Sequence, residues 1–268
     1  MRRLVVYPTF LCPFSCKFCF NREKVLLNEY MKLELLNDFL VQNHHLFDEI
    51  YISGGEPMNF PKEYFNNLVE IVKKYIQNIK VLTYPFKMDN YRGDVDYIVS
   101  YDFLAKPRSL DVWRNLFFFE KPFDVQISMH PLLFKYHPNA VLKKISRVPN
   151  IKSVELKPYY RSIMNDYAIN ENVQKMFLKT WVQSTLSVPF VNKNKEYLKK
   201  INDYPNVYDE DNIEEYCLLY DMTFCIYDLD EKQRFKYTAI DIKDIDDYHS
   251  KYNTIYPKDV IEWSKTIF

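Results

Sequence analysis

Short apolar runs alternate with helix-period apolar stripes along the first 165 residues of this 268-residue chain. The runs end at turn-forming residues and have the length of buried strands. Between most of them, apolar residues recur at helical spacing, as Phe65, Leu68, Val69 and Val72 do behind Pro61, which is typical of a helix with one buried face. We therefore expect strands at residues 3–11, 49–53, 79–84, 97–101, 124–129 and 152–157, and helices at 29–47, 61–76, within 105–118 and at 139–147.

This order of elements predicts an α/β fold with a parallel sheet, because strands separated by helices form βαβ units. Right-handed crossovers would curl the six strands into a partial (β/α)6 barrel of the TIM type. The connection after residues 79–84, punctuated by Gly93, is too short for a full helix. In barrels of this kind, chemistry collects at the carboxyl ends of the strands.

Beyond Pro158 the pattern changes. A helix is expected at residues 172–184, a polar irregular stretch at 185–215, a hairpin formed by 223–229 and 234–240, and a closing helix at 257–268. We therefore divide the chain into a barrel core, residues 1–165, and a C-terminal α+β extension, residues 166–268. This extension is expected to cap the barrel and to shape a substrate pocket.

Composition excludes several classes of protein. Lys+Arg and Asp+Glu both total 36, and this formal neutrality argues against broad binding to nucleic acid. No apolar run approaches the ~20 residues that a membrane span requires, and no secretory signal opens the sequence. Five cysteines in a chain of this length are no disulfide framework. We expect a cytoplasmic protein that keeps its thiols reduced.

Three of these cysteines stand close together after the first strand. Cys12, Cys16 and Cys19 are spaced C-x3-C-x2-C, so soft thiolates can surround one metal centre. A tetrahedral zinc site normally needs four ligands, and the next histidines, His44 and His45, lie further along the chain. Three thiolates suit a [4Fe–4S] cluster that leaves one iron open, although four cysteines are usual. Burial of three apolar cysteines in a core would not explain this spacing.

A second motif follows the strand at residues 49–53. Gly54 and Gly55 are two of only three glycines in the chain, and Glu56 and a proline come next. Glycine lets a backbone bend sharply and approach a ligand closely. The C-x3-C-x2-C motif, the aromatic Phe18 before its third cysteine, and this G-G-E-P motif together resemble the radical S-adenosylmethionine (SAM) superfamily.

This resemblance implies a cofactor pair and a reaction. It implies that Cys12, Cys16 and Cys19 hold a [4Fe–4S] cluster whose free iron binds the amino and carboxylate groups of SAM. It implies that the G-G-E segment hydrogen-bonds the SAM amino group. A flavodoxin or ferredoxin would supply the electron that cleaves SAM, and the resulting 5′-deoxyadenosyl radical would take hydrogen from a substrate. The family's partial (β/α)6 barrel would cover roughly residues 3–165.

Further candidates stand near the ends of the later strands. The resemblance favours Ser100 as a contact to the SAM ribose, and Ser128 is a second candidate for SAM. Lys157 could pair with the SAM carboxylate or an anionic substrate, or could simply be solvated. Aromatic strand ends and one histidine could face the substrate, although a chain with 23 Tyr and 20 Phe must also bury many rings. These substrate candidates are Tyr7, Tyr84, His130 and Tyr159.

The substrate itself is not specified by any motif. A nucleotide, sugar or other small molecule is our first hypothesis; modification of a ribosomally made peptide and activation of a partner protein are alternatives. Cys217 and Cys225 are too few for the additional clusters that many peptide-modifying members carry, so one cluster is expected. A non-catalytic iron–sulfur carrier or zinc module is the alternative from another class, and the G-G-E-P motif argues against it.

Overall fold

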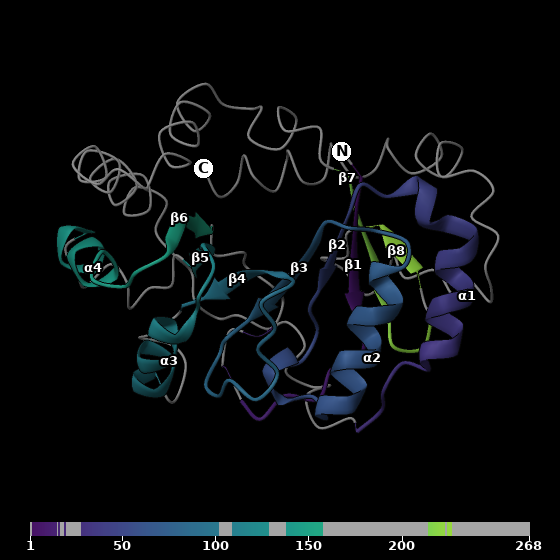
Figure 1. Ribbon diagram of the computed structural model, residues 1–268, viewed down its shortest axis with the longest axis horizontal. Coiled ribbons are helices and arrows are strands. Elements are labelled where there is room, and N and C mark those ends of the chain that lie inside the picture. Colours follow the sequence, from purple (N-terminus) through teal and green to yellow (C-terminus); the bar gives the residue numbers. More distant parts are fainter. Residues whose placement is uncertain are drawn as a thin grey trace.

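The computed structural model describes residues 2–14, 16, 19, 28–101, 109–128, 138–157, 214–222 and 224–226. At its centre lies one sheet with the strand order β6-β5-β4-β3-β2-β1-β7-β8 (Figure 1). Strands β1 to β7 run parallel, and only β8 is antiparallel to its neighbour. The strands are β1 (Arg2–Tyr7), β2 (Glu49–Ile52), β3 (Ile79–Thr83), β4 (Asp96–Ser100), β5 (Phe123–Ser128), β6 (Ile151–Lys157), β7 (Glu214–Leu219) and β8 (Phe224–Ile226).

Helices pack on one face of this sheet. α1 and α2 lie side by side against its β1–β3 part, and α3 and α4 lie near β4–β6 (Figure 1). β3 and β4 are joined without a helix, as the sequence predicted. The helices are α1 (Leu33–Asn43), α2 (Lys62–Lys73), α3 (Ser109–Asn115) and α4 (Pro138–Ile145), with the 3-10 turns η1 (His44–Leu46), η2 (Pro57–Asn59) and η3 (Leu116–Phe118).

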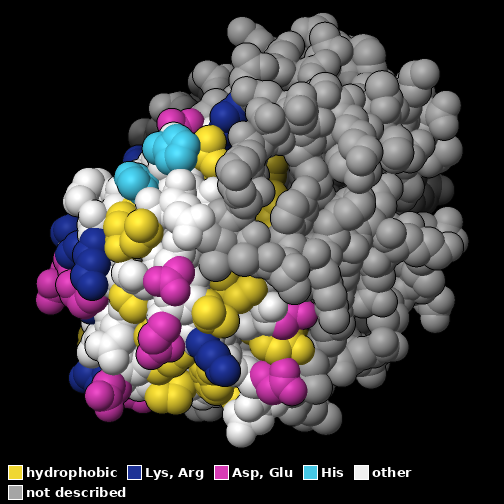
Figure 2. Space-filling model, turned by 90° about the vertical axis from the view of Figure 1, so that its right-hand side faces the viewer, with side chains coloured by type: hydrophobic (Ala, Val, Ile, Leu, Met, Phe, Trp, Pro, Cys, Tyr) yellow, Lys and Arg dark blue, Asp and Glu magenta, His cyan; other side chains and the backbone are white. Residues whose placement is uncertain are grey.

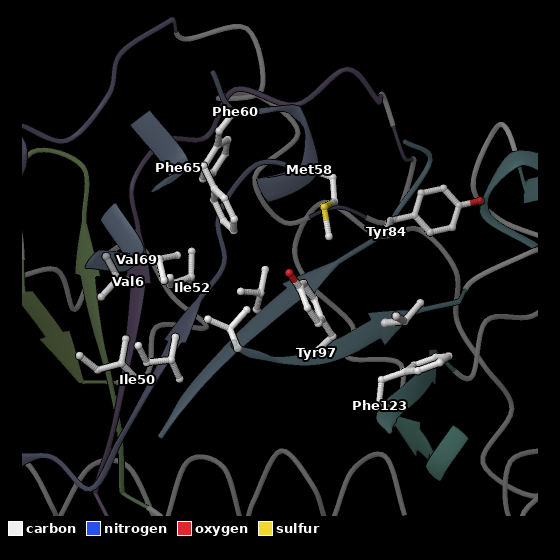
Figure 3. Close-up of a cluster of buried hydrophobic side chains, with 14 of the residues drawn as sticks. Val6, Ile50, Ile52, Met58, Phe60, Phe65, Val69, Tyr84, Tyr97 and Phe123 are labelled. Carbon is white, nitrogen blue, oxygen red and sulfur yellow. The ribbon is translucent and has the colours of Figure 1, made fainter. Parts of the chain in front are cut away.

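The main hydrophobic core lies between the helices and the sheet (Figure 3). Val6, Ile52 and Val81 are neighbours across β1, β2 and β3, and all three are fully buried. Phe65 and Val69 of α2 pack against this face and are also fully buried. The strands therefore present alternate residues to the helices, and the residues between them face the other side of the sheet.

That other face carries polar residues at the amino-terminal end of the strands. The Arg3 guanidinium lies 4.0 Å from the centre of the Tyr51 ring and donates a 2.7 Å hydrogen bond to Glu49. Lys80 donates to the Tyr51 hydroxyl at 3.2 Å and lies 3.3 Å from the Glu49 carboxylate. Burial raises the pKa of Tyr51, so it stays a neutral phenol between the two cations. This cluster joins β1, β2 and β3 at the end of the sheet opposite the strands' carboxyl ends.

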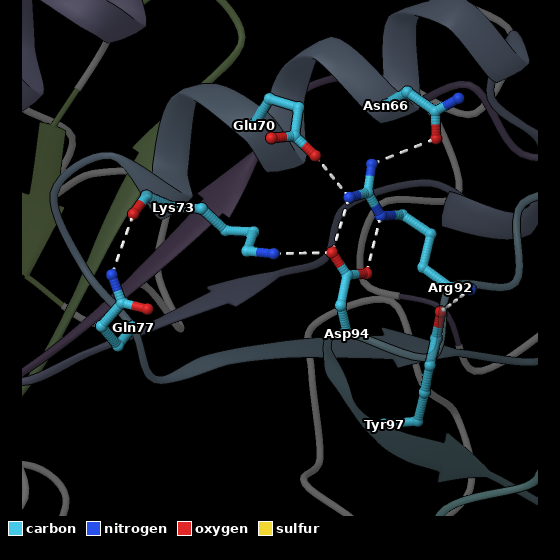
Figure 4. A network of polar contacts seen from close by, with 7 residues as sticks. All are labelled: Asn66, Glu70, Lys73, Gln77, Arg92, Asp94 and Tyr97. Atoms are coloured by element: carbon cyan, nitrogen blue, oxygen red, sulfur yellow. Dashed lines mark hydrogen bonds and ion pairs between the residues drawn. The ribbon is translucent and has the colours of Figure 1, made fainter.

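A second polar network holds the connection between β3 and β4, which contains no helix (Figure 4). Arg92 donates to Glu70 of α2 at 2.5 Å and to Asp94 at 2.7 Å, and its backbone N–H donates to the Tyr97 hydroxyl at 2.8 Å. Lys73 of α2 donates to Asp94 at 2.6 Å. Arg92 and Lys73 hold the pKa of the Asp94 carboxyl well below its usual range. The network fastens the short connection to α2.

The structure confirms the predicted parallel α/β architecture and corrects several boundaries. The first strand ends at Tyr7, well short of residue 11, because Pro8 lacks a backbone N–H and the chain turns away. The expected helix at 29–47 is represented by α1, which is shorter, and by η1.

The C-terminal strands differ more from the prediction. The polar stretch expected to be irregular through residue 215 in fact leads into β7, which begins at Glu214. β7 pairs with β1, and its apolar run shows no alternation because both faces of the strand are buried. β8 pairs with β7; the partner predicted for it, residues 234–240, lies outside the described residues.

The described surface shows no broad charged field on the face seen in Figure 2. Acidic, basic and apolar side chains are interspersed there. This distribution agrees with the equal numbers of acidic and basic residues in the chain. None of the described helices is long and apolar enough to cross a membrane.

Candidate functional site

The three clustered cysteines follow the carboxyl end of β1. Cys16 is buried and packs in the main core, whereas Cys12 and Cys19 are partly exposed beside it. All three are free thiols. The Cys19 N–H donates to the Cys16 carbonyl at 3.1 Å, so a tight turn connects these two positions.

The electrostatics of Cys12 indicate that the thiols share one environment. Burial raises the pKa of Cys12 to about 12, the backbone of Phe14 lowers it, and the charges of Glu56, Cys16 and Cys19 raise it further. Without a bound cation, Cys12 is therefore a neutral thiol. A metal centre reverses this balance, because a coordinating thiol is deprotonated outright. A positive centre would thus favour the thiolate form of Cys12.

The donor set has the chemistry of an iron–sulfur site. Iron–sulfur clusters are held by cysteine thiolates, and three of them leave one iron of a [4Fe–4S] cluster open. Cys12, Cys16 and Cys19 are therefore suitable ligands for such a cluster.

The two glycines after β2 press directly against the cysteine-bearing loop. A Cβ atom on Gly55 would lie 1.9 Å from the Leu11 carbonyl oxygen, and one on Gly54 would lie 2.4 Å from that of Thr9. Gly54 also has a φ of 104°, which side chains rarely adopt. The Gly55 N–H donates to the Thr9 carbonyl at 2.8 Å. The cysteine loop and the glycine turn therefore form one unit that only glycine permits.

The carboxylate of Glu56 points into the protein and joins two strand ends. It is 3% exposed and accepts hydrogen bonds from the Met58 N–H at 3.0 Å and the Tyr84 N–H at 2.8 Å. The Thr83 hydroxyl, at the end of β3, also donates to it. Glu56 thus links the segment after β2 to the carboxyl end of β3.

Aromatic rings support the cysteine loop from the same side. The Phe14 ring packs edge-on against Tyr84 and Phe86, with centroid distances of 5.3 and 4.9 Å. Tyr84 is only 2% exposed. Its ring therefore packs under the cysteine loop. The substrate contact predicted for Tyr84 stays a prediction.

The other predicted site residues lie at the carboxyl ends of the strands, where they can be placed. Tyr7 ends β1, and Ser100 ends β4 on the face opposite the core residue Val99. Ser128 and Lys157 end β5 and β6 and are register partners, although only their backbones are described. The fold thus brings these positions to one edge of the sheet. Phe18, His130 and Tyr159 lie outside the described residues.

Two residues at this site were missed by the sequence analysis. Thr83 contacts Glu56 from 27 positions away in the chain. Asn90 is 2% exposed and donates to the carbonyls of Pro57 and Phe60, at 3.0 and 2.8 Å. Neither belongs to a motif, and only the pairing of β2 with β3 brings their segments together. Neither residue was assigned a role at the site from the sequence.

The additional cysteine Cys217 lies on β7, away from these motifs in the sequence. It is 5% exposed and packs with Val5, Phe10 and Leu219 on the face of the sheet opposite the helices. Cys225 is its register partner on β8; only the backbone of Cys225 is described.

Comparison with known proteins agrees with this geometry. Residues 2–100 match the family model of a 4Fe-4S single cluster domain. The structure is similar to that of anSMEcpe with bound AdoMet, with a TM-score of 0.70 and 14% identity over 93% of this chain and 83% of that one. It is also similar to Streptococcus suis SuiB bound to S-adenosylmethionine, with a TM-score of 0.58 and 13% identity over 83% of this chain and 59% of that one. No curated protein matches the sequence significantly.

These findings bear on the predicted fold and on the predicted cluster site. An open sheet of parallel strands, matched by the solved structures, confirms the predicted partial barrel. The matched cluster domain spans both the cysteine motif and the G-G-E-P motif. The comparisons thus show the fold of the predicted superfamily and a 4Fe-4S single cluster domain over residues 2–100.

Proposed function

We propose that this chain is a radical SAM enzyme that uses a [4Fe–4S] cluster and SAM to abstract hydrogen from a substrate. The observation that carries this proposal is the close fit of Gly55 to the cysteine loop, where even a methyl group would strike the Leu11 carbonyl. A protein that only carried electrons would have no need for a SAM-binding motif built against its cluster loop. The confirmed fold and cluster domain support the same conclusion.

The chain's own residues hold and orient the two cofactors. Cys12, Cys16 and Cys19 would hold three irons of the cluster, and the Gly54–Glu56 segment would hold the SAM amino group beside the fourth. Bound together, cluster and SAM supply reductive cleavage and a radical able to take hydrogen. Ser100, Ser128 and Lys157 are proposed to bind other parts of SAM or an anionic substrate. The protein's task is to orient SAM and one C–H bond and to keep water out.

A small polar molecule is our first candidate for the substrate. The face of the sheet opposite the helices carries polar side chains along β5 and β6. Gln126 donates to Glu155 at 2.9 Å in the middle of the two strands, and Ser153 donates to Asp124 at 2.5 Å nearer their amino-terminal ends. A few fixed hydrogen-bonding groups of this kind orient a small ligand in a pocket. The extension at residues 166–268 is proposed to complete that pocket.

A peptide is the second candidate. One structure with this fold is anSMEcpe with AdoMet and the Cp18Cys peptide, and another is SuiB bound to the precursor peptide SuiA. We propose a flavodoxin or ferredoxin as electron donor for either substrate. A reducing, cytoplasmic environment suits the free thiols of the described residues.

The decisive experiment uses full-length protein purified and reconstituted without oxygen. SAM and dithionite are added, and 5′-deoxyadenosine is measured by mass spectrometry, with the three-cysteine alanine variant as control. Formation of 5′-deoxyadenosine by the wild type alone supports the proposal. Deuterium uptake from pools of labelled metabolites or peptides then identifies the hydrogen donor. A protein that holds its cluster but neither binds nor cleaves SAM would instead be an iron–sulfur carrier.

A further inference from the structure

We propose that Thr83 is a positioning residue of the SAM site, because its hydroxyl holds the Glu56 carboxylate and thereby fixes the glycine turn against the cysteine loop. This inference rests on the proposed function. It concerns the residue that sets the geometry of the G-G-E segment, which sequence motifs alone do not reveal.

The first step of the argument is the direction of the Glu56 side chain. The carboxylate is buried and receives two backbone N–H groups and one hydroxyl, all from within the protein. Hydrogen bonds to a charged acceptor are about twice as strong as neutral ones. These three donors therefore hold the Glu56 carboxylate in its buried orientation.

The second step is that only one of the three donors is a side chain. The N–H groups of Met58 and Tyr84 belong to the backbone and stay in place when side chains change. Thr83 is 2% exposed and ends β3, so its hydroxyl has little freedom to leave the carboxylate. Among these three donors, Thr83 is thus the one at which side-chain substitution can loosen Glu56 while leaving Glu56 itself intact.

The third step is that the residues around Glu56 couple its position to that of the cysteine loop. Asn90 fixes the segment on its other side through the carbonyls of Pro57 and Phe60. Gly55 packs directly against the cysteine loop, so there is no room for even a methyl group between them. A small rotation at Glu56 therefore shifts the groups that would face the SAM amino group.

The test compares Thr83→Val, which keeps the shape but removes the donor, with Thr83→Ser, which keeps the hydroxyl. SAM affinity is measured by equilibrium dialysis on reconstituted protein, together with iron content and the EPR spectrum of the reduced cluster with and without SAM. We expect Thr83→Val to weaken SAM binding about tenfold and to alter the SAM-induced EPR change, with iron content retained. Thr83→Ser should stay near the wild type.

Tyr75→Phe is the matched control. It also deletes a hydroxyl that donates a hydrogen bond, here from the turn after α2 to Asn37 of α1 at 2.9 Å and away from the carboxyl ends of the strands. We expect it to lower thermal stability slightly and to leave SAM affinity unchanged. If it weakened SAM binding as much as Thr83→Val does, loss of stability would explain both results and the inference would be wrong.

A double-mutant cycle distinguishes a positioning role from direct contact with SAM. If Thr83 acts through Glu56, Thr83→Val should add nothing to the loss caused by Glu56→Ala. Additive losses, or wild-type affinity in Thr83→Val, would overturn the inference. Failure of the wild type itself to bind SAM would instead refute the proposed function, so the two failures can be told apart.

Discussion

Two glycines decide whether the two motifs of the site can meet. Gly55 allows the segment after β2 to lie against the Leu11 carbonyl, and Gly54 supplies the positive φ of the turn. Gly93 has no neighbour within 4 Å of its ideal Cβ position. The same residue type is therefore indispensable at one place and replaceable at another.

We expect Gly55→Ala to destabilise the protein by about 3 kcal/mol and to reduce its iron content after reconstitution, because the added methyl group must displace backbone. Urea unfolding and iron analysis measure the two effects. Gly93→Ala is the control and should match the wild type in both. Normal iron content and stability in Gly55→Ala would contradict the close fit described for this site.

At the scale of elements, β7 is the strand that links the C-terminal part of the chain to the sheet. It pairs with β1 along its whole length, from Arg2 opposite Glu214 to Tyr7 opposite Leu219. Leu218 is fully buried in the main core and lies opposite Val6. β7 thus covers an edge of β1 that would otherwise expose unpaired backbone groups.

Leu218→Ala should therefore cost about 2–5 kcal/mol of folding free energy, as expected for a fully buried leucine. Val41→Ala on α1 removes an aliphatic side chain that is 53% exposed and should change stability by less than ~0.5 kcal/mol. Urea unfolding of both variants makes the comparison. Equal stability would mean that β7 does not belong to the cooperative fold.

The network of Figure 4 predicts a pH dependence for the connection between β3 and β4. Because the pKa of Asp94 is lowered in the folded state, its stabilising effect is complete above the ordinary carboxyl pKa of about 4 and is lost as the pH falls below it. Asp94 is 40% exposed, so the effect should stay below ~1 kcal/mol. Asp94→Asn should be less stable than the wild type at pH 6 and equally stable near the acid limit. Thermal unfolding at several pH values tests this; a difference that grew in acid would contradict it.

At the scale of the whole molecule, the sheet brings several strand ends to one edge. The cysteine loop follows β1, the glycine turn follows β2, and Thr83, Ser100, Ser128 and Lys157 end the next four strands. Parallel strands in neighbouring positions make this convergence unavoidable. The candidate site residues at the ends of β1 to β6 therefore belong to one site.

We accordingly expect one cluster per chain, with about four irons. Alanine at Cys12, Cys16 or Cys19 should abolish the cluster, measured as bound iron and sulfide and by EPR. Cys217→Ala should retain the full iron content, because Cys217 packs among apolar side chains. A loss of iron in Cys217→Ala, or about eight irons in the wild type, would indicate a second cluster.

The sequence by itself determined strands β1 to β6, their parallel arrangement and the two motifs of the site. It could do so because a buried strand, an amphipathic helix and a metal-binding loop each leave a local pattern. β1 to β6, α2 and the cysteines lie where that pattern placed them, with shifts of a few residues at the ends.

Only the tertiary structure decided which distant residues complete the arrangement. β7 joins β1 from the far part of the chain, and the run that forms it carries no alternation because it is covered on both faces. Thr83 and Asn90 hold the G-G-E-P segment through single hydrogen bonds that leave no mark in the sequence. The carboxylate of Glu56 could bind a ligand by its chemistry. The direction in which this side chain points depends on hydrogen-bond donors at the end of β3. Local patterns record what a segment must bury, whereas the partners of a polar side chain are set by how the strands are brought together.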